Sequence, residues 1–162
     1  MNRKQEPQGC LFVILKLLGL APTTDSAAVQ LPYQRKDYLL TKAERSFFGV
    51  LQNAVGNRYL IFAKVRLADL VFLPRGTDKW QSHFNRIQSK HIDFVLCDHD
   101  VVRPLVAIEL DDSSHNRTAR QDRDAFVDSA LAAAGLPILH VPARASYNVQ
   151  ELANAIEQEL QA

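Results

Sequence analysis

The stretch HIDFVLCDHDVVRPLVAIELDD, residues 91–112, predicts two β-strands joined by a short turn. If the strands pair as an antiparallel hairpin that turns around Val101, Asp93 lies opposite Glu109. In this register the apolar positions also match in pairs, Val95 with Ala107 and Cys97 with Leu105. Both strands are apolar on their other face too, which indicates a central, buried place in a sheet.

The hairpin brings carboxylates together at one end. Glu109 and Asp111 share a strand face, about 6.6 Å apart along the strand, and Asp93 joins them from the facing strand. Opposed like charges destabilise a sheet unless a cation lies between them, and hard cations such as Mg²⁺ or Mn²⁺ prefer carboxylate oxygens. We therefore predict a metal site at Asp93, Glu109 and Asp111. The alternatives are a register shifted by one residue, which would separate Asp93, or acids that merely cap the following turn.

The composition is that of an ordinary globular domain. The 162 residues are 47% hydrophobic and 23% charged, which favours one domain with a hydrophobic core over a disordered chain. The formal net charge of +1 excludes a strongly basic nucleic-acid coat but leaves room for a local basic cleft. Cys10 and Cys97 form no metal-binding pattern and favour a reducing compartment over a disulfide scaffold.

Residues 1–30 are expected to form an N-terminal apolar segment and linker, and residues 31–162 the folded domain. The apolar run at 10–20 is shorter than the roughly 20 residues that span a bilayer. Two basic residues before it would suit a signal peptide, but Lys16 within the run argues against one. We favour a short helix that packs on the domain or on a membrane surface, and a cytoplasmic location over membrane association or export.

Helix and strand signals alternate along the domain. Thr41 and Glu44 form a capping box that starts a helix, and Gly56 ends it. Next in chain order we expect one long strand or two short ones at 58–73, a turn or two of helix at 80–87, and the hairpin. After the hairpin we expect a helix at 119–135, a strand at 136–143 and a helix at 148–162. The strand at 136–143 is buried on both faces if it lies in mid-sheet. The order α-β-β-β-α-β-α predicts an α/β (α+β) fold with a mixed sheet flanked by helices.

Several phrases of the chain resemble the PD-(D/E)XK nuclease superfamily. They are LLTKAERSFF at 39–48, FAKVRLADL at 62–70, DFVL at 93–96, ELDDSSH at 109–115 and AGLPILHV at 134–141. The similarity is strongest to a branch of uncharacterised bacterial domains related to the very-short-patch-repair endonucleases, and it extends over most of residues 31–160. This resemblance implies a restriction-endonuclease-like fold, a divalent metal ion and phosphodiester hydrolysis.

Position by position, the resemblance implies that Asp93 is the acid of the first core strand and Glu109 that of the second. The lysine that the superfamily usually carries two residues later is replaced by Asp111. Relatives in which Asp111 and His115 take its place suggest His115 as a general base or metal ligand. Lys64 on the earlier strand is another source of the missing positive charge, although an exposed strand lysine is as plausible.

Two acids on helices resemble supporting positions. Glu44 is similar to a helix acid that completes the metal site in some members, and its capping box alone is the equal alternative. Asp122 lies on the helix face expected to meet the sheet, where it would orient His115. A surface ion pair with Arg123 or Arg120 is the simpler interpretation of Asp122.

The resemblance implies a metal-dependent endonuclease that acts on nucleic acid with Mg²⁺ or Mn²⁺; DNA is the expected substrate, and the choice between DNA and RNA stays open. Arg117, Arg120 and Arg123 follow the acids directly and would hold backbone phosphates, or would simply form a solvated helix face. The competing interpretation is a catalytically weakened nuclease-like domain that binds nucleic acid or a protein partner, since the usual lysine is absent. A homodimer and weak membrane association through residues 10–20 stay open.

Overall fold

The computed structural model describes residues 31–111 and 117–161, without the side chains of residues 117–124. The chain divides into two units, Met1–Asp37 and Tyr38–Ala162, and every helix and strand described below belongs to the second. Among the described residues, no helix combines the length and the apolar character needed to cross a membrane.

The second unit is built on a four-stranded mixed sheet with the order β1-β2-β3-β4. Its strands are β1 (Leu60–Arg66), β2 (His91–Cys97), β3 (Pro104–Asp111) and β4 (Ile138–Pro142). β1 pairs with β2 and β2 with β3 in antiparallel directions, whereas β3 and β4 run parallel. The predicted α+β class with a mixed sheet is confirmed.

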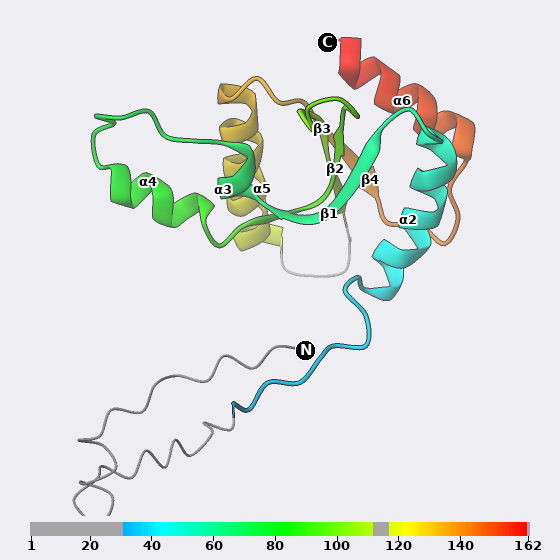
Figure 1. The fold of residues 1–162 in the computed structure, drawn as a ribbon, viewed down its shortest axis with the longest axis horizontal. Helices are drawn as coiled ribbons and strands as arrows, with labels where there is room; N and C mark the ends of the chain where they lie inside the picture. The colour runs from blue at the N-terminus through cyan, green and yellow to red at the C-terminus, as the bar shows by residue number, and fades with distance from the viewer. Residues whose placement is uncertain (1–30, 112–116, 162) are drawn as a thin grey trace, which may run out of the picture. The chain divides into compact units, whose positions relative to one another are not determined.

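Helices cover both faces of the sheet (Figure 1). They are α2 (Lys42–Val55), α3 (Leu67–Leu70), α4 (Trp80–Ile87), α5 (Arg117–Ala133) and α6 (Val149–Gln161). Side chains of α2 and α6 share a core with Phe94 and Ile108 of the sheet. A second core joins the α3–α4 region and α5 to Val95 and Ala107 on the opposite face. Neighbouring strand residues thus serve different cores, as the twofold alternation of a strand requires.

The start of α2 follows from its capping box. The Glu44 amide donates to Thr41 Oγ1 at 3.3 Å, and the Thr41 amide donates to Glu44 Oε2 at 3.0 Å. At the other end Gly56 takes φ +55°, where a residue without Cβ avoids steric strain. The predicted boundaries of this helix are confirmed.

The predicted hairpin is confirmed in its middle and wrong at its turn. Val95 pairs with Ala107 as expected. Cys97, however, pairs with Pro104 and not with Leu105, because the register shifts by one residue between Leu96 and Cys97. Such an irregularity accommodates an extra residue near the end of a ladder without moving the buried pairs.

Two other predicted elements need correction. In residues 58–73 the strand ends at Arg66 and the short helix α3 follows, because Leu67 turns into the second core and its amide donates to the Lys90 carbonyl. The strand at 136–143 does not lie in mid-sheet. β4 is an edge strand that pairs with β3, and its residues are partly or largely exposed, His140 among them.

Replacing the fully buried Phe94 by alanine should lower the free energy of unfolding by about 3–5 kcal/mol. Its ring packs against those of Phe47 and Phe48, so the substitution leaves a cavity between α2 and the sheet. The matched control Phe72→Ala removes a ring that is 86% exposed and should cost less than about 0.5 kcal/mol. Urea unfolding followed by circular dichroism measures both, and equal losses would contradict this core.

Candidate functional site

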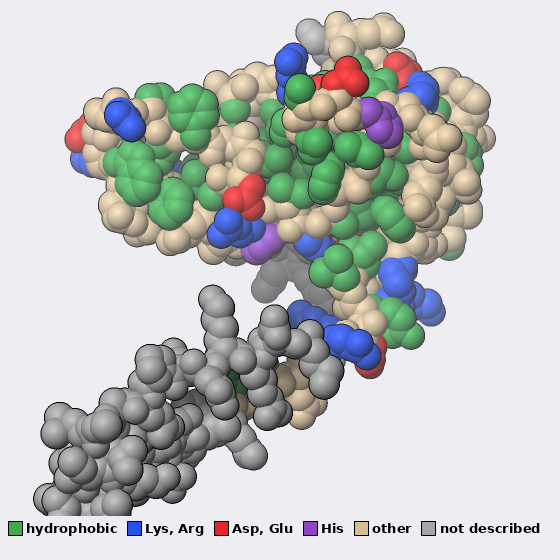
Figure 2. All heavy atoms as spheres, viewed as in Figure 1, with side chains coloured by type: hydrophobic (Ala, Val, Ile, Leu, Met, Phe, Trp, Pro, Cys, Tyr) green, Lys and Arg blue, Asp and Glu red, His purple; other side chains and the backbone are tan. Residues whose placement is uncertain are grey.

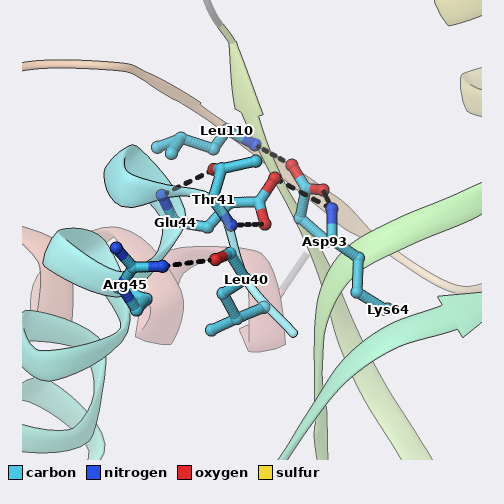
Figure 3. A network of polar contacts seen from close by, with 7 residues as sticks. All are labelled: Leu40, Thr41, Glu44, Arg45, Lys64, Asp93 and Leu110. Atoms are coloured by element: carbon cyan, nitrogen blue, oxygen red, sulfur yellow. Dashed lines mark hydrogen bonds and ion pairs between the residues drawn. The ribbon is translucent and has the colours of Figure 1, made fainter. Parts of the chain in front are cut away.

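One lysine ammonium joins two carboxylates that come from different elements (Figure 3). Lys64 Nζ of β1 donates to Glu44 Oε1 of α2 at 2.9 Å and to Asp93 Oδ1 of β2 at 2.7 Å. The side chains of Lys64, Glu44 and Asp93 are 29%, 11% and 15% exposed, so the network lies mostly out of solvent. We call these three residues the lysine network.

The backbone of Lys64 makes this contact possible. Its φ is +57°, a left-handed conformation that is uncommon for a residue with a Cβ. Ala63 packs against the first core and Val65 against the second, although residues two apart in a regular strand share a face. The left-handed residue therefore breaks the alternation of β1 and lets the ammonium reach α2.

β2 shows the same break at the position opposite. Lys64 and Asp93 lie between the paired residues Ala63–Phe94 and Val65–Ile92. Ile92 is buried in the second core while Phe94 is buried in the first, so alternation fails across Asp93 as well. The two strands depart from regularity side by side, and the departure brings Lys64 and Asp93 together at the N-terminus of α2. Backbone strain of this kind collects at functional sites.

Both carboxylates of the network have a second fixed partner. Asp93 Oδ2 accepts a hydrogen bond from the Leu110 amide of β3 at 3.1 Å. Glu44 Oε2 accepts from the Thr41 amide at 3.0 Å, within the capping box. The two interpretations of Glu44 are therefore compatible, since one oxygen caps the helix while the other holds Lys64.

The network favours the charged form of its lysine. Burial opposes the charge, but the hydrogen bonds to Asp93 and Glu44 and the attraction of their negative charges outweigh it. The pKa of Lys64 is raised above its ordinary value as a result. The group is a fixed cation next to the first predicted metal ligand.

Glu109 and Asp111 belong to β3, the strand that pairs with β2. Ile108 and Leu110 pack toward the first core, so Glu109 and Asp111 share the opposite strand face with Ala107, which is in the second core. The expectation that Glu109 and Asp111 share a face agrees with this placement. Asp93 lies where the alternation of β2 fails, and its carboxylate accepts hydrogen bonds from Lys64 and from the Leu110 amide, so it faces β3 as well as the lysine network.

A histidine holds Asp111 in a second cluster that the sequence analysis missed. His140 of β4 has Nδ1 3.3 Å from Asp111 Oδ1 and Nε2 3.1 Å from Asp128 Oδ1 of α5. Burial works against the imidazolium, but the hydrogen bonds to Asp111 and Asp128 outweigh it, so the pKa of His140 is raised. A histidine within the apolar phrase PILHVP was the signal available in the sequence.

The remaining predicted residues cannot be placed in the same way. His115 lies outside the described residues. Arg117, Arg120, Arg123 and Asp122 belong to the first turns of α5, but their side chains lie outside the description.

The fit of a metal ion is judged from the donor side chains. Within residues 31–111 and 125–161, no three His, Cys, Asp or Glu side chains gather in a metal-binding arrangement. The oxygens of Asp93 each accept one hydrogen bond, from Lys64 and Leu110, and a carboxylate oxygen can accept more than one. Glu109 lies on the neighbouring strand β3, directly after Ile108, which pairs with Phe94 of β2. Hard oxygen donors on neighbouring strands fit Mg²⁺ or Mn²⁺ chemically.

The left-handed backbone of Lys64 predicts an unusual order of stabilities. Lys64→Ala should cost on the order of 1–3 kcal/mol, because it leaves two partly buried carboxylates without their cation. Lys64→Gly removes the same cation but accepts φ +57° without strain. It should therefore be the more stable of the two by roughly 0.5–1 kcal/mol, against the usual order in strands.

Urea unfolding of the two Lys64 variants measures this difference. Val65→Gly and Val65→Ala, at the neighbouring strand position with no positive φ, should show the usual order, with alanine more stable. A Lys64→Gly variant that is less stable than Lys64→Ala would contradict the strained conformation.

A match to a protein family covers nearly the same residues as the second unit. Residues 36–160 match the family described as Protein of unknown function (DUF2726). No curated protein and no solved structure matches the chain significantly. Since the family match covers most of its length, the chain belongs to the DUF2726 family.

Proposed function

We propose that this protein is a divalent-metal-dependent nuclease that hydrolyses phosphodiester bonds of nucleic acid. The observation that carries the proposal is the 2.7 Å contact between Lys64 Nζ and Asp93 Oδ1. The nuclease pattern requires a lysine beside the metal-binding acids, and this chain has Asp111 at the usual place. Lys64 supplies an ammonium to the same acid from the adjacent strand.

The charges of the site favour a divalent cation. The lysine network holds one ammonium against two carboxylates, and Glu109 adds a third acid on the next strand. A phosphodiester would be repelled from this excess of negative charge unless a cation compensated for it. Asp93 and Glu109 would hold the ion, and a bound Mg²⁺ or Mn²⁺ would supply a nucleophilic water and charge neutralisation.

The role we assign to Lys64 is to hold positive charge against a phosphate oxygen. Preorganised cations stabilise the charge that develops in the transition state, and they act more strongly where water is excluded. Glu44 is a positioning residue in this scheme, because it fixes the ammonium through Oε1 while its other oxygen is tied to the helix start. Arg117, Arg120 and Arg123 are proposed phosphate contacts from the helix that follows β3.

Asp93→Asn and Glu109→Gln should each lower the cleavage rate by about 10³-fold, because each replaces a charged metal ligand by a neutral amide. The assay incubates the protein with single- and double-stranded DNA and RNA in Mn²⁺ and in EDTA. Asp100→Asn, a matched change at an exposed acid of the hairpin turn, should cleave like the wild type. Mn²⁺ titration by calorimetry follows binding separately.

Each outcome of this assay is decisive. Metal-dependent cleavage lost in both site variants supports the nuclease. Metal binding without cleavage favours the weakened, binding-only domain. The absence of both contradicts the site.

Lys64→Met should slow cleavage by about 10²-fold without weakening Mn²⁺ binding. Loss of the ammonium removes charge stabilisation from the phosphate, but it also removes a cation that competes with the metal for Asp93. Steady-state rates and calorimetry, at a temperature where circular dichroism shows the variant folded, measure both effects. A fall in Mn²⁺ affinity equal to the fall in rate would mean that Lys64 only supports the fold.

A further inference from the structure

A broad groove lies on the second face of the sheet. It has a volume of about 980 Å³ and runs between α5 and the connection from α3 to α4. Small side chains of α5, such as Ala130 and Ala133, form part of its wall, and Phe72, Arg86 and Phe126 also line it. Figure 2 shows hydrophobic side chains gathered over α4 and the segment before it, with basic side chains among them.

Several aromatic rings near this groove are exposed to solvent. Phe72 lines it and is 86% exposed. On α4 the ring of Trp80, which is 42% exposed, stacks on that of Phe84 with centroids 4.9 Å apart and planes 10° from parallel. Exposed apolar surface of this kind marks a place where a partner binds.

Cations accompany these rings. The Arg86 guanidinium lies over the Phe126 ring with its central carbon 3.9 Å from the ring centroid, and Lys90 Nζ lies 5.6 Å from the same centroid. The segment 72–90 contains the basic residues Arg75, Lys79, Arg86 and Lys90 against the single acid Asp78. The groove therefore combines apolar and aromatic surface with the Arg86 guanidinium, and the segment that borders it is rich in basic residues.

We infer that this groove binds a single strand of nucleic acid. Unpaired bases stack on aromatic side chains and on arginine planes, while the backbone phosphates follow basic residues. A duplex hides its base faces within its own stack, so it cannot use Phe72 or Phe126 in this way. The exposed rings could also contact an apolar peptide, a second copy of this chain or its own residues 10–20. None of these partners would supply negative charge for the excess of basic residues.

The position of the groove links it to the proposed nuclease site, on which this inference rests for its biological meaning. Lys90 is near the Phe126 ring and precedes Asp93 by three residues. The two residues are at most about 11 Å apart along the chain. A strand held over Phe126 would thus reach the segment that leads into β2 and Asp93. The inference assigns unpaired nucleic acid as the substrate class.

Binding can be tested without cleavage, in EDTA, by fluorescence anisotropy of labelled single-stranded DNA, single-stranded RNA and duplex DNA of equal length. The full-length protein should bind single strands at least tenfold more tightly than the duplex. Phe72→Ala and Arg86→Ala should each weaken single-strand binding by about fivefold to a hundredfold. Phe62→Ala and Arg144→Ala remove the same side-chain types from exposed positions outside the groove and should bind as the wild type does.

A photoreactive phenylalanine analogue at position 72 identifies what occupies the groove. A crosslink to the oligonucleotide supports the inference, whereas a crosslink within the chain or to a second copy overturns it. Equal affinity for duplex and single strands, or unchanged binding by both groove variants, also overturns it.

The two proposals fail in different ways. Metal-dependent cleavage by a protein whose Phe72 and Arg86 variants bind normally would remove the groove and keep the nuclease. Single-strand binding that depends on these residues, without cleavage under any metal, would keep the groove and remove the nuclease.

Discussion

The ammonium of Lys64 is the interaction on which the candidate site depends. It ties the first turn of α2 to two strands of the sheet, since its partners Glu44 and Asp93 come from separate elements. Without it, two mostly buried carboxylates would face each other and repel. The left-handed backbone at Lys64 is the conformational cost of this arrangement, and the regular alternation of both strands gives way around it.

The end of β3 lies between two clusters with the same charge pattern. On one side Lys64 lies between Glu44 and Asp93, and on the other His140 lies between Asp111 and Asp128. In each case one nitrogen base joins two carboxylates, and the carboxylates favour its charged form. Glu109 belongs to the strand that separates them.

The proposed nuclease and the proposed groove describe one path for a nucleic acid. In this proposal the aromatic and basic side chains of the groove would contact bases and phosphates, and Lys90 directly precedes β2, which carries Asp93. A single strand bends more easily than a duplex, so it can follow a surface that turns from the α4–α5 side toward the lysine network. Substrate choice would then depend on the unpaired state of the bases more than on their sequence.

Much of the fold was accessible from the sequence because its signals are local. The capping box of Thr41 and Glu44 spans four consecutive residues, and the hairpin pairing of Val95 with Ala107 follows from alternation along each strand. The edge position of β4 was left open and the turn into α3 was predicted wrongly, because both depend on which side chains reach the second core.

The candidate site, too, could be predicted from the sequence only in part. The sequence by itself determined which acids lie on the two central strands and that an aspartate, Asp111, stands two residues after Glu109. Only the tertiary structure decided that Lys64 meets Asp93 and Glu44, and that His140 meets Asp111 and Asp128. The physical reason is that a left-handed residue inside a strand has no signature in side-chain periodicity. Contacts between a helix and an edge strand likewise depend on packing between segments that are distant in the chain.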